Sequence, residues 1–333
     1  MIRLETFLPD GSATQREMHP LPADAKNSAI ISAKQLFIKH ELLQKGVICC
    51  GMSDAIPRYP ELVENYFLKS GVKLDEHKFL SLHGSFFAEG IFLFVPEGLV
   101  IEVPFSVIHH IDAGNFHAPH NLIVVGDGAR LIFFEDQASD DFSEQVLHCG
   151  VTEVLCGADS SVEIITLHRF GENVYDISNK YCRVGRNGKI TWTSLYLGGS
   201  LTKIKSVFST SDKGASLNQF DALVATKAKH FDVNSVFRHD VSDTTGQMRF
   251  FAVCKDHSRV IFRGEISIAE KAVRTDSFLS TKILLTSETC RADTIPILKI
   301  NANDVRCKHA ATQGNIDKEQ MFYLQSRGIA KND

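Results

Sequence analysis

Short apolar runs separated by turn residues fill this chain from about Lys78 to Ala310, and they constrain its fold more than any other feature. Most runs have four to eight residues. Many are rich in β-branched or aromatic side chains that alternate with polar ones, as in Lys189–Leu197. Such runs predict β-strands, because successive side chains of a strand face opposite sides of a sheet. No long amphipathic pattern interrupts the series, so the sequence predicts a mainly β protein.

A weak internal repeat groups these runs. Small or charged turn residues recur about 30 residues apart, in the range of a repeated supersecondary unit, at Gly126–Ala129, Gly157–Ser160, Arg186–Gly188 and Asp212–Ala215. Strands in series without crossover helices can stack as a β-helix, in which each coil buries its inward face on the next. A β-sandwich is the competing interpretation. It needs tighter hairpin turns, and Asn187–Gly188 is the only strong one.

The chain divides into three parts on these patterns. We expect residues 1–77 to be a mixed, partly helical segment, residues 78–314 to be the β-helix core, and residues 315–333 to be a short helical segment. A β-helix has open ends with unpaired strand edges, which must be capped or paired with another chain. The helical segments are positioned to cap part of these edges, and the rest indicates dimerisation.

Both helical segments carry boundary signals. Ser53–Phe67 is predicted to be helical, with Ser53 as an N-cap and Pro60 in a first turn. Near the C-terminus, Asp317 precedes Gln320 by three residues, which is the spacing of a capping box. Gly328 is then a typical helix end.

Charge and cysteine content limit the partners. The net charge is −4 and no basic stripe is present, so we expect neither nucleic acid nor anionic membrane as a partner. No uncharged stretch approaches the roughly 20 residues of a spanning helix, and the N-terminus lacks the pattern of a signal peptide. The eight cysteines include no CxxC pair and no close, even spacing. A reducing cytosol is therefore the expected location.

Cys307 and His309 form the candidate metal site. In an extended segment Val305, Cys307 and His309 share one face, while Arg306 and Lys308 share the other. The charged pair must face water, which turns the thiol and the imidazole inward or toward a covered surface. These two groups are ligands suited to iron–sulfur clusters, iron, zinc or copper. Two ligands do not complete a site, and the alternative is a packed thiol with a hydrogen-bonded imidazole.

A second group of potential ligands contains four histidines within twelve residues, His109, His110, His117 and His120. Their spacing matches no standard zinc pattern. A turn between strands, with surface histidines, is the favoured interpretation.

The remaining cysteines and carboxylates favour structural roles. Cys49 and Cys50 are adjacent and would face opposite sides of a strand, so they cannot easily bind one ion. The pairs Glu135-Asp136 and Asp140-Asp141 could serve glycoside chemistry, but a solvated acidic turn is the favoured interpretation. We interpret the other cysteines as buried thiols. No P-loop, GxSxG elbow or HExxH motif is present.

The C-terminal residues resemble a known family. Asp304–Gly314 (DVRCKHAATQG) and Ile316–Ile329 (IDKEQMFYLQSRGI) look like the closing signature of the SufB/SufD family, the scaffold proteins of the SUF iron–sulfur cluster assembly system. Val260–Gly264 and the aromatic run Phe86–Gly98 fit the same pattern. The resemblance extends from about residue 46 to residue 329, and its last part is the most specific.

Within the family the Cys-x-His-x-Ala-Thr-x-Gly form is similar to the SufD type, and His309 falls on the histidine implicated in cluster assembly. SufB-type chains carry cysteines near the positions of Thr281 and Ile300 and a glutamate at that of Ala310, which this chain lacks. A SufB-type partner would supply those ligands.

The resemblance implies a right-handed parallel β-helix between helical segments. It also implies a dimer, with a SufB-type chain or with itself, joined near the end of the β-helix beside His309. An iron–sulfur cluster or iron would be held transiently and shared with the partner subunit. A SufC-type ABC ATPase docks on the C-terminal helices of relatives, which usually continue beyond the position of Ile329. The chain itself would not be an enzyme.

Two other functions remain open. A β-helix carbohydrate-active enzyme would need carboxylates along a groove, for which the sequence offers only Glu135–Asp141. A purely structural β-helix partner would have no metal role.

Overall fold

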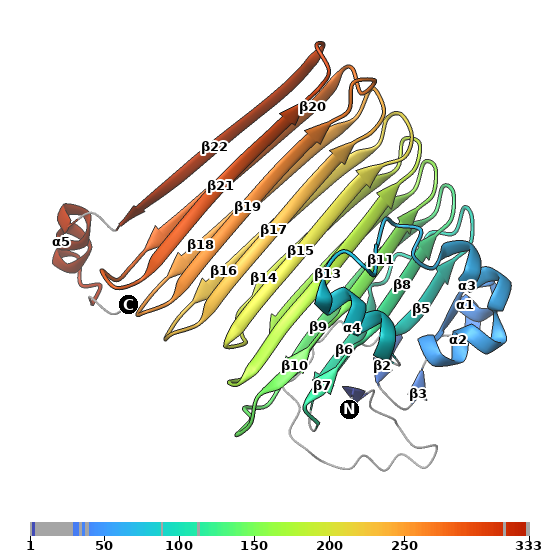
Figure 1. Ribbon diagram of the computed structural model, residues 1–333, viewed down its shortest axis with the longest axis horizontal. Coiled ribbons are helices and arrows are strands. Elements are labelled where there is room, and N and C mark those ends of the chain that lie inside the picture. Colours follow the sequence, from blue (N-terminus) through green and yellow to red (C-terminus); the bar gives the residue numbers. More distant parts are fainter. Residues whose placement is uncertain are drawn as a thin grey trace.

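The computed structural model describes residues 2–3, 29–32, 35–36, 40–87, 89–111, 114–315 and 318–330 (Figure 1). A long body of stacked strands has short helices at its N-terminal end and one helix beyond its last strand. No helix in these ranges is both long and apolar enough to cross a membrane. The predicted mainly β fold with flanking helices is confirmed.

The described residues form two eleven-stranded sheets, which make up the body. The first sheet contains, in spatial order, β22 (Val305–Asn315), β20 (Thr275–Leu285), β18 (Thr245–Cys254), β16 (Ser216–Ala225), β14 (Lys189–Tyr196), β12 (Ser161–Arg169), β9 (Arg130–Ser139), β6 (Phe105–Ile111), β2 (Ala29–Ser32) and β3 (Gln35–Leu36), with β1 (Ile2–Arg3) beside β6. The second sheet contains β21 (Arg291–Ile300), β19 (Arg259–Ile268), β17 (His230–His239), β15 (Leu201–Thr210), β13 (Val174–Val184), β11 (Val151–Cys156), β8 (His120–Val125), β5 (Ile91–Val95) and β4 (Ile48–Gly51), with β10 (Val146–His148) beside β13 and β7 (Phe116–His117) beside β10.

From β11 to β22 consecutive strands alternate between the two sheets. Each strand from β11 to β20 therefore pairs in parallel with the strand two places further along the chain, as β14 does with β16 and β16 with β18. In this register Lys189 lies opposite Ser216, and Ser216 lies opposite Thr245. The arrangement is a parallel β-helix, and it excludes the alternative sandwich, whose sheets are antiparallel.

Inward-facing side chains line up from coil to coil in columns. Phe105, Phe133, Ile164 and Trp192 occupy successive positions of one column in the first sheet, and all four are buried. The indole N–H of Trp192 donates to Oγ1 of Thr166 at 2.7 Å, which satisfies the polar atom that burial would otherwise leave unpaired. The alternating residues of the sequence thus become an apolar core and a polar exterior.

The predicted turns connect strands of one sheet to strands of the other. Neighbouring coils approach each other closely at these turns. At Gly157 an added Cβ atom would lie 2.5 Å from Oδ1 of Asp127 and 2.7 Å from its backbone nitrogen, so only glycine fits. Asn187 has a φ of 52°, a left-handed conformation that asparagine tolerates. Small residues in these turns therefore allow the coils to stack.

The N-terminal helices are α1 (His40–Gln44), α2 (Met52–Arg58), α3 (Pro60–Tyr66) and α4 (Lys78–Phe86). Most of Ser53–Phe67 is helical as predicted, but Tyr59, with a φ of −132°, separates α2 from α3. A residue before proline is disfavoured in the helical region, and Pro60 does begin α3 as expected. Gly51, rather than Ser53, is the N-cap of α2.

Helices α2 and α3 cover part of the outer face of the second sheet. Met52, Ala55 and Val63 pack against Phe92 and Leu122 of β5 and β8 in a cluster separate from the core between the sheets. Outward-facing apolar residues of the first coils are therefore removed from water by the chain itself.

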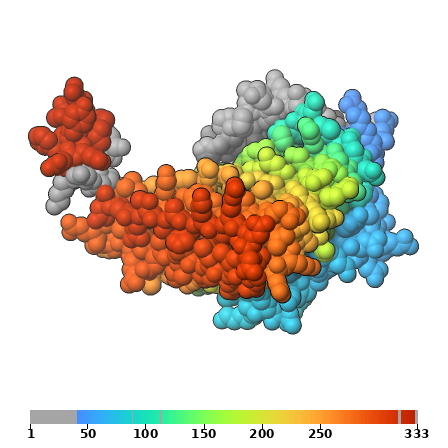
Figure 2. Space-filling model, turned by 90° about the horizontal axis from the view of Figure 1, so that it is seen from above, coloured from blue at the N-terminus to red at the C-terminus, as the bar shows by residue number. Residues whose placement is uncertain are grey.

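The C-terminal helix α5 (Lys318–Ser326) follows β22. The predicted N-cap residue Asp317 lies outside the described residues. Gly328 has a φ of 91° just after the helix, as expected for a glycine that ends one. Figure 2 shows α5 standing apart from the strands.

Candidate functional site

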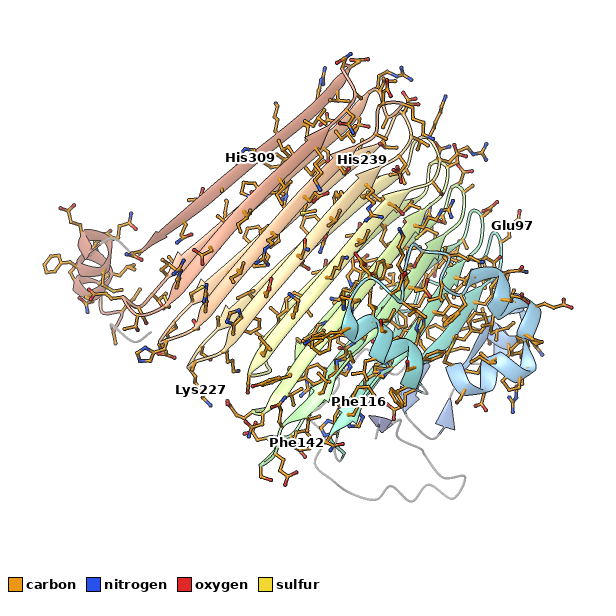
Figure 3. The ribbon with its side chains drawn as sticks, in the orientation of Figure 1. Glu97, Phe116, Phe142, Lys227, His239 and His309 are labelled. Atoms are coloured by element: carbon orange, nitrogen blue, oxygen red, sulfur yellow. The ribbon has the colours of Figure 1, made fainter. Side chains whose placement is uncertain are left out.

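The candidate site lies on β22, at the open end of the β-helix. Among the described residues β22 pairs only with β20, and β21 pairs only with β19. No further coil stacks on this end within the part of the chain that the structure describes. Figure 3 shows His309 on this last strand.

The register places Cys307 and His309 at the ends of two inward-facing columns. Cys307 lies opposite Ser277 and His309 lies opposite Leu279, and both β20 residues are buried. Cys307 is half-buried and packs against the core, whereas His309 is exposed. Both groups therefore continue the inward face, as expected, but only the thiol is covered. The imidazole is exposed because no described coil covers it.

The two side chains differ in how readily each could bind a metal. Burial, with a smaller effect of Asp276, raises the pKa of the Cys307 thiol, so the group is a thiol rather than a thiolate at neutral pH. A metal would have to displace its proton before binding. His309 makes no hydrogen bond or ion pair with any other described residue. Its ring is therefore available as a ligand without the loss of an existing contact.

The residues around Cys307 and His309 add no further soft metal ligand. Gln313 reaches across the end of the coil and donates from Nε2 to the carbonyl of Ala292 at 3.2 Å. Thr281 is buried in the column beside His309, and its Oγ1 has no hydrogen bond among the described residues. Ile300 is exposed at the end of β21. Neither position offers a soft ligand.

A complete metal site is not present in the described residues, where no group of three or more His, Cys, Asp or Glu side chains could hold an ion. Cys307 and His309 thus provide two groups at most. Any iron held there would need ligands from another molecule or from the cargo itself.

The four neighbouring histidines do not converge, since each lies near a different carboxylate. The ion-pair distances are 3.2 Å for His109–Glu135, 3.9 Å for His110–Asp140, 3.7 Å for His117–Glu89 and 2.9 Å for His120–Glu153. The interpretation of these residues as surface histidines is wrong for His109, His117 and His120, which are buried. His109 lies on the inward face of β6 and His120 lies under α4, and a nearby carboxylate makes this burial possible.

The His120–Glu153 pair belongs to a buried series of hydrogen-bonded side chains, here called the relay, which could not be predicted from the sequence. His83 of α4 bonds through Nδ1 to the carbonyl of Cys149 at 2.8 Å and through Nε2 to Nδ1 of His120 at 2.9 Å. His120 then bonds to Glu153, which accepts from the hydroxyl of Ser70 at 2.6 Å. The relay fixes α4 and the segment before it on the second sheet. Burial and the nearby His120 lower the pKa of His83 to about 4.

A second polar group lies inside the coils. Lys180 donates to Ser194 Oγ and to Tyr196 OH, each at 3.0 Å, and burial lowers its pKa to about 8. Asp176 accepts from His148 and His168 at 2.9 and 3.0 Å. No sequence signal separates these residues from ordinary strand positions, because only the stacked register brings them together.

Predictions for the carboxylates need correction. Glu135 is buried and accepts from Asn121 at 2.7 Å, and Asp136 is bound bidentately by Arg169. They are therefore not a solvated turn, as only Asp140 and Asp141 are exposed. Glu135 and Asp136 are adjacent on β9 and face opposite sides of the sheet. They cannot flank one glycosidic bond.

The cysteine predictions are confirmed. All eight are free thiols, and every one except Cys307 is buried. Cys49 packs in the core between the sheets and Cys50 packs in the cluster under the helices, so the two do face opposite sides.

The fold and the site together define a class of protein: a parallel β-helix with a free imidazole and a half-buried thiol on its exposed last strand. Comparison with known families makes this specific. The model of the SUF system FeS cluster assembly SufBD core domain matches residues 108–333, and that of the SufBD protein N-terminal region matches residues 27–107. The chain belongs to the SufBD family of iron–sulfur cluster assembly proteins.

Curated relatives agree with this assignment. The chain is 29% identical over 300 residues to the iron–sulfur cluster assembly protein SufD of Bacillus subtilis (strain 168), which covers 90% of this chain and 69% of the relative. It is 26% identical to SufBD family proteins of Staphylococcus epidermidis and Staphylococcus saprophyticus, with 89% of this chain and 64% of each relative covered. The chain spans about two thirds of the length of these relatives, and it is a SufD homologue.

Proposed function

We propose that the protein is a SufD-like scaffold subunit that presents His309 to an iron–sulfur cluster, or to iron, at a joint between two subunits. The observation that carries this proposal is the contrast within one column: Leu279 is buried, whereas His309 in the next coil is exposed and makes no hydrogen bond or ion pair with another described residue. The cluster is cargo rather than a resident cofactor. It would be held transiently, and the chain would have no catalytic activity of its own.

The second subunit in this proposal is a SufB-type chain or another copy of this one. An unpaired strand edge such as that of β22 is suited to pairing with another chain. The joint would bring further ligands to His309, which the described residues do not supply. It would also cover Cys307, whose raised pKa makes it a helper that binds only after losing its proton.

Other parts of the proposal rest on the family. A SufC-type ATPase would dock on helices at the C-terminal end, where α5 is exposed. Neither nucleic acid nor membrane is proposed as a partner, and the free thiols are consistent with the cytoplasm as its location. We also propose residues 1–77, 78–314 and 315–333 as the functional division. The carbohydrate-active alternative loses its support, since Glu135 and Asp136 face opposite sides of β9.

The test is coexpression of the chain with a SufB-type subunit and the ATPase, followed by anaerobic purification and assay of iron and sulfide. We expect the His309→Ala complex to assemble but to contain several-fold less iron. His257→Ala is the matched control, because His257 is also exposed and lies in a turn between β18 and β19.

A structural subunit without a metal role is the second candidate, favoured by the absence of a complete ligand set among the described residues. It predicts equal iron in the two variants. Failure of the complex to form at all would contradict both candidates.

A further inference from the structure

Four polar side chains lie together inside the first coils of the β-helix: His109 on β6, Glu135 and Gln137 on β9, and His168 on β12, called here the interior cluster. All four are at most 5% exposed. The parallel register places Gln137 between His109 and His168 in one inward-facing column. Glu135 lies two residues from Gln137 on the same face of β9 and accepts from Asn121 of the second sheet at 2.7 Å. The cluster is therefore enclosed between the two sheets.

Each member of the interior cluster has a buried polar atom that makes no hydrogen bond with another described residue. These atoms are Oε2 of Glu135, Oε1 of Gln137, Nε2 of His168 and both ring nitrogens of His109. Of the two nitrogens of His109, Nε2 lies 3.2 Å from Oε1 of Glu135 as an ion pair. Buried polar atoms of native proteins are nearly always paired with protein or with ordered water. Four such side chains at one place therefore indicate a partner other than these residues.

The donors and acceptors of the cluster define that partner. His168 donates from Nδ1 to Asp176 at 3.0 Å, and burial lowers the pKa of its ring, so Nε2 is an acceptor. The free oxygens of Glu135 and Gln137 also accept, and His109 carries at least one N–H whether neutral or protonated. Water can both donate and accept. A metal ion cannot accept from an N–H, and the part of the chain that the structure describes holds no group of three ligands for one.

The charge of Glu135 adds an energetic reason for such a partner. Burial raises the pKa of Glu135, but His109 and Gln137 outweigh this effect and lower it to about 2. The carboxylate is therefore ionised at neutral pH although it is enclosed in the protein. An ionised carboxylate has about four sites for hydrogen-bond donors, and a buried charge without enough of them is costly. Further donors at Oε2 therefore stabilise the folded chain.

Polar side chains continue from the interior cluster into the following coils. The Glu135 column of the first sheet holds buried polar residues in four successive strands: Glu135, Thr166, Ser194 and Asp221. In the next strand the column holds Phe250, whose ring stacks on Phe262 of the second sheet with the centroids 4.0 Å apart. The aromatic pair ends this polar stretch before β20 and β22. The cluster is therefore separate from the candidate site.

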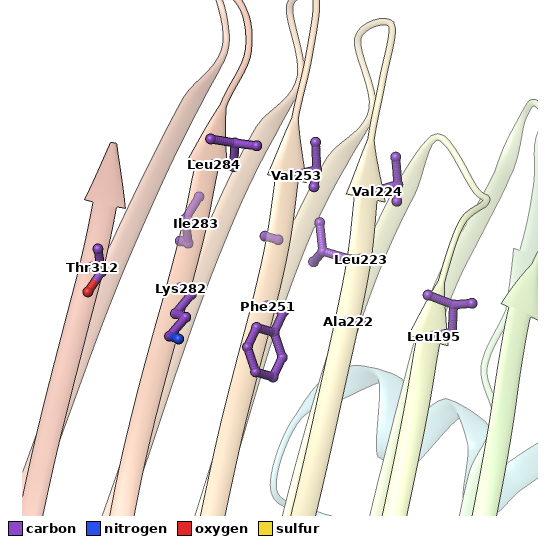
Figure 4. Close-up of a pocket in the computed structure, with 11 residues that line it drawn as sticks. Leu195, Ala222, Leu223, Val224, Phe251, Val253, Lys282, Ile283, Leu284 and Thr312 are labelled. Atoms are coloured by element: carbon purple, nitrogen blue, oxygen red, sulfur yellow. The ribbon is translucent and has the colours of Figure 1, made fainter. Parts of the chain in front are cut away.

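Polarity inside these strands contrasts with their outer face. On β14 and β16, Leu195, Ala222 and Val224 line an apolar groove on the outside of the first sheet (Figure 4). Ser194 and Asp221, which precede Leu195 and Ala222 in the chain, are polar and face inward. This is the reverse of the usual alternation, in which polar side chains face water. A buried water needs polar partners and space, and short inward side chains such as that of Ser194 favour both.

We propose that the interior cluster is a binding site for water, in which about two molecules bridge Glu135, Gln137 and His168 and accept from His109. A buried water typically makes about three hydrogen bonds, so two molecules match three acceptors and one donor. They hold the charge of Glu135 between the sheets and join β6, β9 and β12 through side chains as well as through the backbone. The inference goes beyond the proposed function and does not depend on it, since it involves neither iron nor His309.

The first measurement is a crystal structure of the full chain at a resolution that shows ordered water. We expect two density peaks in the interior cluster, each within about 3.2 Å of two or more of its unpaired atoms. Direct hydrogen bonds among the four side chains, with no density between them, would overturn the proposal. An anomalous signal at the peaks would also overturn it, because the ligand would then be a metal ion.

The second measurement counts long-lived internal waters of the full chain in solution by ¹⁷O relaxation dispersion. Gln137→Leu removes one acceptor with little change in side-chain size, and we expect the count to fall by about one or two waters. Gln247→Leu is the matched control, because Gln247 is exposed on the outer face of β18, and it should leave the count unchanged. Equal counts in Gln137→Leu and the unsubstituted chain would contradict the proposal.

A third measurement needs no variant and decides the matter if Gln137→Leu does not fold. Histidine is labelled with ¹³C and ¹⁵N in the unsubstituted chain, and magnetisation transfer from water to the ring protons of His168 is recorded by nuclear magnetic resonance. A water bound at Nε2 predicts direct transfer to this ring, although His168 is only 1% exposed. Absence of transfer would overturn the proposal.

Discussion

Leu279 and His309 lie opposite each other on the neighbouring strands β20 and β22. Leu279 is completely buried and His309 is exposed. They occupy successive positions of one inward-facing column, so the difference arises because a further coil covers the leucine and no described coil covers the histidine. A position that forms the core in the preceding coils is therefore exposed on the last described strand.

This relationship predicts that truncation to alanine destabilises the chain strongly at Leu279 and hardly at all at His309. Leu279→Ala removes packed methyl groups and leaves a cavity, so we expect the free energy of unfolding to fall by about 2–5 kcal/mol. His309→Ala should change it by about 0.5 kcal/mol or less, as for other exposed positions. Urea unfolding of the isolated chain measures both values. Equal losses would mean that the imidazole is part of the core.

Acid should weaken the attachment of α4 through His83. Its pKa is about 4 in the folded chain and near 6.5 when unfolded. The unfolded state therefore binds more protons between these values, and stability is constant above pH 6.5 and falls as the pH drops toward 4. The full effect is about 3 kcal/mol. Urea midpoints from pH 7.5 to 4 measure it.

His83→Gln provides the control for this pH dependence, because an amide can donate to a carbonyl without titrating. It should be less stable than the unsubstituted chain at pH 7 and should show a shallower decline toward pH 4. An identical slope in both proteins would contradict the role of His83.

The interior lysine should matter for stability although it lies far from the candidate site. Lys180→Met leaves the buried hydroxyls of Ser194 and Tyr196 without their partner, and we expect a loss of about 1–3 kcal/mol. Adding Asp221→Asn should recover part of this loss, because Asp221 is a buried carboxyl whose pKa burial raises and the charge of Lys180 lowers, so without the lysine its charged form loses a stabilising partner. Lys189→Met, at an exposed position of β14, is the control and should have little effect in the same unfolding assay.

Thiol labelling should distinguish Cys307 from the other cysteines. It is half-buried and the other seven are buried, so a small maleimide should modify one cysteine in the native chain and eight after denaturation. The raised pKa of Cys307 predicts that labelling accelerates as the pH increases. Peptide mapping identifies the modified residue, and rapid labelling of several cysteines would contradict the packing described.

Much of the fold follows from local patterns. Alternating strands such as Thr245–Cys254 and small turn residues such as Gly157 suffice to predict stacked coils, because each strand buries one face and each turn requires close approach. The break between α2 and α3 could also have been predicted from Pro60, had its effect on the preceding residue been considered. Boundaries of this kind depend on one or two residues.

The polar interior could not be predicted in the same way. His120 and Glu153 are separated by 33 residues and meet only because β8 and β11 are adjacent in the second sheet. Each looks like an exposed polar residue when read along the chain. For the candidate site, the shared face of Cys307 and His309 was predictable from alternation, whereas the exposure of His309 depends on where the stack of coils ends.

The most direct test of His309 as a cluster ligand is pulsed electron paramagnetic resonance of the reduced cluster in the assembled complex, with histidine labelled by ¹⁵N in this chain alone. A scaffold that presents His309 as a ligand predicts a ¹⁵N coupling to the cluster that disappears in His309→Ala and persists in His257→Ala. A cluster that forms with no ¹⁵N coupling, or whose coupling is unchanged in His309→Ala, would contradict the account.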